Sequence, residues 1–187
     1  LRIERLALTY GLCRAYGLFD LPTTRLIEAR DATEDEIVAF HRPDYLDVFR
    51  ASERGNPPPN LWDYGLGTSD NPTFPGMYAW SLLSTGASLQ AMELVDSGEV
   101  ECAFNIAGGL HHAAAASAAG FCYFNDAAIV IKHLLRRGRR VAYVDIDAHH
   151  GDGVQFGFYE TDGVLTISIH ESGETLFPGT GFAEEIG

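Results

Sequence analysis

The sequence has few cysteines, few basic residues and no long apolar run. Its three cysteines, without a CxxC spacing, argue against a disulfide framework and favour a reducing compartment. The 13 basic residues face 26 acidic ones, a formal charge of −13, so direct binding to nucleic acid is not expected. No apolar run approaches the ~20 residues of a membrane span, and no signal-peptide pattern is present. We therefore expect a cytoplasmic protein that neither enters a membrane nor binds nucleic acid directly.

The composition is that of a folded domain. Apolar residues make up 46% of the 187 positions and charged residues 21%, which excludes wholesale disorder. This length permits one domain with a hydrophobic core. The chain begins at Leu1, within a helix-like pattern, and stops at Gly187 after a glycine-rich loop.

The first half is predicted to be helical. Helical spacing of apolar residues, a capping-box pair at Thr33 and Glu36, and Pro43 at a helix start carry this prediction. The helices are expected over residues 3–16, 33–40, 43–50 and from about 87 to 98. Residues 55–75 form a long loop rich in proline and glycine, and loops of this length are often functional.

The second half predicts alternating strands and helices. Strands are expected over residues 100–107, 141–147 and 164–170, with helices over about 127–137 and 154–159. This order is the signature of an α/β domain with a parallel sheet. Such sheets bind ligands at the carboxyl ends of their strands, so the functional site is expected there.

Polar residues gather where each predicted strand ends. Residues 108–112 are GGLHH, residues 145–153 are DIDAHHGDG, and residues 168–170 are SIH, followed by FPGTG at 177–181. Several histidine and aspartate side chains are therefore expected to converge on one rim of the sheet.

The second of these clusters indicates a metal site. Asp145, Asp147 and His149 alternate along an extended segment, so their side chains share a face. A carboxylate and an imidazole at this spacing can reach one divalent ion, although a catalytic zinc site needs a third protein ligand from elsewhere. Polar capping of the strand end is the alternative. Four carboxylate or imidazole groups within six residues favour the metal.

The tandem His111 and His112 follow two glycines, which permit a turn and let a ligand approach the backbone. Adjacent histidines suit general acid–base catalysis when a carboxylate orients each of them, and Asp145 and Asp152 are available for this. An ordinary pair of loop histidines is the alternative reading of the same residues.

Two aromatic residues and three cysteines complete the candidates. Phe121 and Phe177 lie in loops at the same rim, either as core residues or as walls of an apolar channel to the metal. Cys122 is interpreted as a small buried residue rather than a nucleophile, and Cys13 and Cys102 are expected in the core.

Together, these motifs resemble the zinc-dependent histone deacetylase family. The resemblance is carried by residues 108–113 (GGLHHA), 120–126 (GFCYFND), 145–154 (DIDAHHGDGV) and 177–181 (FPGTG), and it extends from about Arg5 to Gly187. Residues 64–72 (YGLGTSDNP) are most similar to the bacterial acetoin-utilisation branch. The resemblance implies the arginase/deacetylase α/β fold, three layers around a mostly parallel central sheet, incomplete in this chain.

The resemblance also implies an activity, hydrolysis of an acetyl-lysine amide, with one Zn²⁺ and structural K⁺. The implied zinc ligands are Asp147 and His149, the acid–base pair is His111 and His112, and the carboxylates that orient this pair are Asp145 and Asp152. The implied substrate residues are Phe121 and Phe177 beside the acyl-lysine tunnel, Gly120 lining it, and Asp70 on the rim. The implied potassium sites are formed by Asp145, Asp147, His149 and Ser168, partly through backbone oxygens, and by the carbonyls of Phe158, Thr161 and Val164.

The chain also departs from the family pattern. The family's third zinc ligand, an Asp, and its oxyanion-stabilising Tyr belong to segments downstream, and an N-terminal strand is expected before Arg5. Residues 114–116 are alanines where polar residues are common. We therefore expect residues 1–187 to be a partial catalytic domain, roughly the N-terminal half. Its interrupted sheet is expected to expose an edge strand and apolar surface, an aggregation liability.

Several functions are compatible with this reading. The substrate is an acetylated protein or a small acylamide, and an acetylpolyamine amidohydrolase is an alternative. A second alternative is a truncated, non-catalytic fragment or a pseudo-enzyme that binds acetylated partners. A binuclear ureohydrolase is disfavoured, because its Asp-x-His-x-Asp motif needs an Asp four residues after Asp147, whereas Asp152 is five away and the tandem histidines have no role there. The oligomeric state is not predicted.

Overall fold

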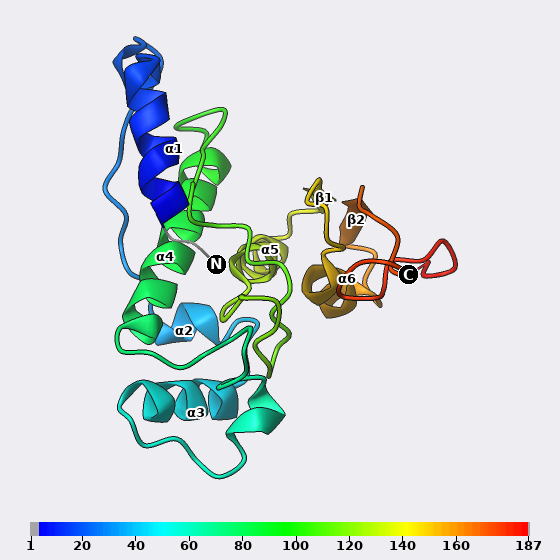
Figure 1. Cartoon of the computed structure of the whole chain (residues 1–187). Coiled ribbons are helices and arrows are strands. Elements are labelled where there is room, and N and C mark those ends of the chain that lie inside the picture. The colour runs from blue at the N-terminus through cyan, green and yellow to red at the C-terminus, as the bar shows by residue number, and fades with distance from the viewer. Residues whose placement is uncertain (1–3, 187) are drawn as a thin grey trace.

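The computed structural model describes residues 4–186 (Figure 1). The elements in chain order are α1 (Glu4–Ala15), η1 (Leu18–Asp20), α2 (Glu34–Ile37), α3 (Pro43–Glu53), η2 (Leu61–Tyr64), α4 (Met77–Asp96), α5 (Asp126–Arg136), β1 (Val141–Asp145), α6 (Asp152–Phe158) and β2 (Val164–Ser168). The first helices lie on one side of α5, and the small sheet with α6 lies on the other (Figure 1).

The predicted helices of the first half are present, with changed limits. The capping box of Thr33 and Glu36 begins α2 as expected, but the helix ends at Ile37 and the next three residues form a turn. Pro43 begins α3 as predicted. None of the residues Glu4–Ala15 of α1 is buried, and Ile3 of the predicted pattern lies outside the described residues.

Helix α4 begins ten residues earlier than predicted. Its first half contains small residues that are buried, among them Ser81, Ser84 and Gly86. A Cβ on Gly86 would collide with the backbone oxygen of Arg30, so the close approach of two backbones requires glycine there. Because small residues rather than large apolar ones make this contact, the sequence shows no apolar stripe over these turns.

The main core lies between α3, α4 and the loop that precedes α5. Phe124 packs edge-on against Tyr45, Phe49 and Tyr78. Phe124 and Phe49 are fully buried. Aromatic residues in this edge-to-face geometry combine a large buried area with favourable quadrupole contacts. The core therefore fixes residues 121–125, which lead directly into the functional site.

The sheet, within the described residues, consists of β1 and β2 in parallel. Its register pairs Val141 with Val164 and Asp145 with Ser168, so the carboxyl ends of the two strands lie side by side. Helices α5 and α6 cover one face, where Val154 and Phe158 pack with residues of both strands. The α/β class and parallel pairing are as predicted, although the strands end at Asp145 and Ser168, earlier than expected.

The other face of this sheet is exposed. Val144 and Ile167 are paired across the strands and are 57% and 42% exposed. Ile146 and Ile169, just beyond the strand ends, are 80% and 69% exposed. Parallel sheets are normally covered on both faces, so this surface is the exposed apolar patch that the sequence predicts.

The prediction of a strand over residues 100–107 is wrong. These residues form no strand, and Phe104 is 81% exposed. The backbone N–H of Ala107 instead donates to Oδ1 of Asn105, and the carbonyl of Ala107 accepts from the hydroxyl of Ser84. Side chains thus replace the strand ladder that the apolar pattern suggested. Cys102 is consequently exposed and Cys13 only partly buried, so neither is the core residue that was expected.

Within residues 4–186, no helix is both long enough and apolar enough to cross a membrane.

Candidate functional site

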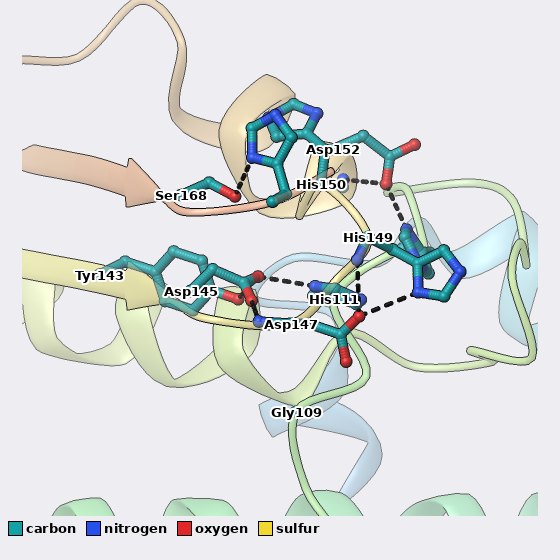
Figure 2. A network of polar contacts seen from close by, with 12 residues as sticks. Gly109, His111, Tyr143, Asp145, Asp147, His149, His150, Asp152 and Ser168 are labelled. Carbon is teal, nitrogen blue, oxygen red and sulfur yellow. Dashed lines mark hydrogen bonds and ion pairs between the residues drawn. The ribbon is translucent and has the colours of Figure 1, made fainter. Parts of the chain in front are cut away.

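The predicted polar clusters meet at the carboxyl edge of the sheet (Figure 2). Asp145 ends β1, and the following loop carries Asp147 and His149 to Asp152, the first residue of α6. The separate loop that contains His111 and His112 reaches the same edge from the other side. The histidine and aspartate side chains thus converge on one rim as expected, although the loop of His111 and His112 does not follow a strand.

His111 is held by Asp145. Its Nδ1 lies 2.6 Å from Oδ2 of Asp145, and both side chains are buried, with 8% and 6% of their surface exposed. A carboxylate only accepts, so the imidazole donates from Nδ1 and its Nε2 is the free nitrogen. The hydroxyl of Tyr143 donates to the same Oδ2 at 2.6 Å, and the backbone N–H of Asp147 donates to Oδ1 at 3.0 Å.

These contacts determine the charges of the pair. Burial alone would raise the pKa of Asp145, but hydrogen bonds from His111, Tyr143 and Asp147 outweigh it and lower the pKa to about 2. Burial likewise opposes a charge on His111, yet the hydrogen bond and the negative charge of Asp145 raise its pKa above the usual value. Burial and the hydrogen bond to Asp145 raise the pKa of Tyr143, so its hydroxyl stays a donor.

His112 is held by a different carboxylate. Its Nδ1 lies 2.7 Å from Oδ1 of Asp152, which also accepts from the backbone N–H of Gly153. The two imidazole rings of His111 and His112 are 4.0 Å apart between centroids. Two neighbouring histidines are thus oriented by two carboxylates from different elements, one at the end of β1 and one at the start of α6.

Asp147 and His149 face each other beside these pairs. Nδ1 of His149 lies 2.9 Å from Oδ1 of Asp147, and the backbone N–H of His149 donates to the same oxygen at 2.8 Å. Both side chains are about half exposed, and the ring of His149 lies 5.9 Å from that of His112. Burial would raise the pKa of Asp147, but the hydrogen bonds from His149 outweigh it and lower the pKa.

The donor set fits part of a zinc site. A carboxylate oxygen and an imidazole nitrogen directed at the same space are the ligand types that zinc prefers. Among residues 4–186, no group of three or more His, Cys, Asp or Glu side chains is placed to hold a metal ion. Asp147 and His149 alone would supply two donors, so a complete zinc site would need another ligand.

Glycine and aromatic residues wall the space in front of His112. The ring of Phe177 packs edge-on to the ring of His112 with centroids 4.9 Å apart. A Cβ on Gly120 would lie 2.5 Å from Cδ2 of His112 and 2.9 Å from Cε1 of Phe177. Phe121 has a φ of 68°, rare for a residue with a side chain, and is 43% exposed. The predicted aromatic residues are thus rim residues rather than core.

Asp70 lies on the long loop, which the structure ties to this wall. The side chain of Asn71, which is buried, donates to the carbonyl of Cys122 at 3.2 Å. The hydroxyl of Tyr123 donates to the carbonyl of Pro72 at 2.6 Å. Both contacts anchor the residues after Asp70 to the segment that follows Phe121, and Asp70 itself is exposed.

The residues expected to bind potassium are distributed over the sheet and α6. Ser168 is paired with Asp145, and its hydroxyl lies 2.7 Å from Nδ1 of His170. The carbonyl of Phe158 accepts from the backbone N–H of Thr161 at 3.2 Å, and Val164 begins β2. These positions stay predictions.

Sequence reasoning missed two features of the site. Tyr143 carries no motif signal, although its place two residues before Asp145 on the same strand face could have indicated the contact. Asn125 and Asp126, within the quoted motif, received no role. Burial raises the pKa of Cys122 to about 12, consistent with the interpretation that it is not a nucleophile.

Comparison with known proteins identifies the class. The histone deacetylase domain family matches residues 1–187. A solved structure of an HDAC homologue from Aquifex aeolicus is 44% identical, with a TM-score of 0.82, over 87% of this chain and 44% of its own. A structure of an HDAC homologue complexed with SAHA matches with the same values. This chain belongs to the histone deacetylase family and has its fold.

Two similar proteins carry the names of individual members of the family. The acetoin utilization protein AcuC of Bacillus subtilis is 42% identical over 186 residues, which are 98% of this chain and 48% of AcuC. The type-1 histone deacetylase 1 of Dictyostelium discoideum is 40% identical over 190 residues, which are 98% of this chain and 37% of that protein. The chain thus spans about half the length of these relatives or less.

Proposed function

We propose that residues 1–187 are roughly the N-terminal half of the catalytic domain of a zinc-dependent deacetylase. Its substrate is the acetyl-lysine amide of a protein, or a related small acylamide, in the cytoplasm. The observation that carries the proposal is the pair of adjacent histidines, each 2.6–2.7 Å from its own carboxylate, beside the exposed donors Asp147 and His149. Family membership supports the same reaction.

Asp147 and His149 would hold the zinc, together with an Asp from a segment outside residues 1–187. Bound zinc supplies Lewis-acid polarisation of the amide carbonyl and acidifies the attacking water. The remaining chemistry is proton transfer. His111 and His112 have their Nδ1 atoms bound to carboxylates, so Nε2 is the nitrogen of each that can exchange a proton with substrate or water.

One histidine of the pair accepts the proton of the attacking water, and the pair returns a proton to the leaving amine. Asp145 and Asp152 fix the tautomer of each ring and stabilise its positive charge when it is protonated. Because the two carboxylates act on different rings, each histidine can change its protonation state while the other stays oriented.

The wall in front of His112 suits a neutral acylated side chain. Phe121 and Phe177 would flank the tunnel, and Gly120 leaves room where any larger residue would collide. Asp70 would hold the backbone of a substrate at the rim. Structural potassium would bind through Asp145, Asp147, His149 and Ser168, and through the carbonyls of Phe158, Thr161 and Val164.

The experiment that tests this function measures acetate released by the full-length, zinc-loaded protein. An acetyl-lysine peptide and an acetylated polyamine are compared as substrates, and a hydroxamate is the inhibitor. We expect hydroxamate-sensitive hydrolysis of the peptide. Hydrolysis of the polyamine alone would establish the amidohydrolase alternative, and two bound manganese ions per chain with no acylamide hydrolysis would reject both.

The second candidate function, for the chain of 187 residues by itself, is that of a non-catalytic fragment or a pseudo-enzyme that binds acetylated partners. It is favoured by the finding that Asp147 and His149 have no third donor among the described residues. We expect this chain alone to bind zinc weakly and to show little or no turnover of a fluorogenic acetyl-lysine peptide. Robust turnover that a hydroxamate blocks would contradict this expectation.

A further inference from the structure

The loop that carries the tandem histidines has little regular structure of its own. Residues 105–113 contain no helix or strand, and yet His111 and His112 are both buried. Buried backbone groups must find hydrogen-bond partners, or they cost free energy. Some partners lie within the loop, because the backbone N–H groups of Gly108 and His111 donate to the carbonyls of Asn105 and Gly109. Others come from side chains of Asn125 and Asp126, at the start of α5, and from α4.

Asp126 holds the loop just before the histidines. Its Oδ1 accepts from the backbone N–H groups of Leu110 at 2.8 Å and of Gly109 at 3.1 Å. Its Oδ2 accepts from the hydroxyl of Ser88 on α4 at 2.5 Å and also lies 3.1 Å from the nitrogen of Gly109. The Asp126 residue is 3% exposed. A buried carboxylate with these donors at a helix N-terminus makes strong, directional bonds.

Asn125 holds the loop on both sides of His112. Its Nδ2 donates to the carbonyls of His111 at 3.2 Å and Ala113 at 3.0 Å. Its Oδ1 caps α5 by accepting from the backbone N–H of Ala128 at 2.9 Å. Its own backbone N–H donates to Nε2 of His41, which burial keeps neutral by lowering its pKa to about 3.

The two residues therefore bind the backbone of residues 109–113 from both sides. His111 must reach Asp145 on β1 while His112 reaches Asp152 on α6, so a rotation of the loop would break both Asp–His contacts. We call Asn125 and Asp126, with their hydrogen bonds to the backbone of residues 109–113, the clamp. The space between the clamp and the preceding residue, Gly108, is narrow. A Cβ on Gly108 would lie 2.6 Å from Oδ2 of Asp126, so only glycine fits at that position without displacing the carboxylate.

We propose that Asn125 and Asp126 are positioning residues that orient the acid–base histidines through hydrogen bonds to the backbone of residues 109–113. This inference deepens the proposed function and rests on it for its catalytic consequence. It predicts that weakening these bonds reduces the rate of the chemical step more than it reduces substrate binding or metal binding.

Asn125→Asp is the most informative variant. Aspartate keeps the capping acceptor for Ala128, since Asp and Asn are equally good N-caps, but it lacks the amide donors to His111 and Ala113. Asp126→Asn keeps one acceptor and removes the charge. The matched control is Asp96→Asn, because Asp96 also binds two partners distant in sequence, Arg137 and Arg139 just after α5, without contacting the histidine loop.

The full-length, zinc-loaded protein is assayed for kcat, KM, zinc content and thermal unfolding. We expect N125D and D126N to lower kcat about 100-fold, the effect of a small misplacement of reacting groups, with KM and the zinc content of the folded protein close to those of D96N. The unfolding temperature should fall in both, because buried backbone groups lose their partners. Ser88→Ala removes one donor to Asp126 and one acceptor of the Asn105 amide. It is the milder variant if either of the others does not fold, and a smaller loss of kcat is expected for it.

The low-field proton signals of the imidazole N–H groups provide a readout that needs no activity. We expect signals from His111 and His112 in the wild type and in D96N, and their loss or shift in N125D, D126N and, to a smaller extent, S88A. Unchanged signals together with unchanged kcat would overturn the clamp. If the wild type has these signals but hydrolyses no acylamide, the proposed function fails while the clamp stands.

Discussion

Nδ1 of His112 lies 2.7 Å from Oδ1 of Asp152, a residue 40 positions further along the chain. This contact joins a loop without regular structure to the first residue of α6. It also gives each histidine a carboxylate of its own, because His111 is bound to Asp145 instead. The pairing of each ring with its own carboxylate is the basis of the first prediction.

Replacement of either carboxylate by its amide is expected to lower kcat of the full-length protein by a factor of about 100 or more, the scale of general acid–base catalysis. Asp152→Asn removes the charge that stabilises protonated His112, and Asp145→Asn does the same for His111. Steady-state kinetics with an acetyl-lysine peptide measures the effect. A variant that keeps wild-type kcat would show that its Asp–His pair is structural only.

Asp147→Ala is expected to remove zinc as well as activity. Asp147 and His149 are the two zinc donors proposed among the described residues, so the loss of either would leave too few ligands for stable binding. Metal analysis of the purified full-length protein is the measurement, and Glu174→Gln, on an exposed loop position, is the control. Stoichiometric zinc in D147A would refute the ligand assignment.

Gly120→Ala tests the wall in front of His112. The added Cβ would meet both His112 and Phe177, so we expect at least a tenfold loss in kcat/KM and weaker hydroxamate binding, about 1.4 kcal/mol or more. Gly98→Ala is the matched control, since Gly98 also has a positive φ, +75° against +51°, but nothing lies within 4 Å of its Cβ. Equal kinetic losses in the two variants would attribute the effect to backbone strain rather than to the wall.

Glu36 provides a pH-dependent test of the fold. Its carboxylate accepts from both terminal nitrogens of Arg30, at 2.8 and 3.0 Å, and mainly this bond lowers its pKa from 4.5 to about 2. Since the folded-state pKa is the lower one, the folded state binds fewer protons. The stabilisation is complete above about pH 4.5 and is lost as the pH falls towards 2.

Glu36→Gln keeps the capping box and removes the charge. We expect it to lower the free energy of unfolding by about 1–2 kcal/mol at pH 7, with the difference from wild type shrinking towards zero as the pH approaches 2. Urea unfolding at several pH values measures this, with Glu160→Gln at an exposed position as control. A difference that does not change with pH would exclude the charge as its source.

The exposed face of the sheet predicts how the 187-residue chain behaves in solution. Ile167→Thr is expected to reduce aggregation and binding of a hydrophobic dye without lowering the unfolding temperature, because Ile167 is 42% exposed. Val164→Thr, on the face packed against α6, is expected to lower the unfolding temperature instead. Light scattering and thermal unfolding distinguish the two, and unchanged aggregation of I167T would show that another surface is responsible.

Part of the site could be predicted because Asp145 ends a strand and Asp147 and His149 follow it. The alternation of Asp145, Asp147 and His149 and the carboxyl-end rule placed them on one rim, and the two glycines before His111 marked the opposing loop. The strand over residues 100–107 failed because an apolar run does not reveal whether a neighbouring strand is present. The side chains of Ser84 and Asn105 make the hydrogen bonds to this backbone instead, and no periodic pattern in a sequence predicts such side-chain contacts.

The roles of Tyr143, Asn125 and Asp126 could not be predicted for a related reason. Each acts on residues that are distant in sequence or through backbone groups, which carry no residue-specific signal. Helix α4 was predicted ten residues too short because small residues such as Ser81, Ser84 and Gly86 are buried beside Met77 and Tyr78 in its first half and interrupt the apolar spacing.

The most direct test of the central claim compares acetate release by the wild type and by His112→Ala, both full-length and with equal zinc content. An acid–base pair beside a metal predicts that H112A loses nearly all turnover of an acetyl-lysine peptide while it keeps its zinc. Turnover at the wild-type level in zinc-loaded H112A would contradict the catalytic role of the tandem histidines.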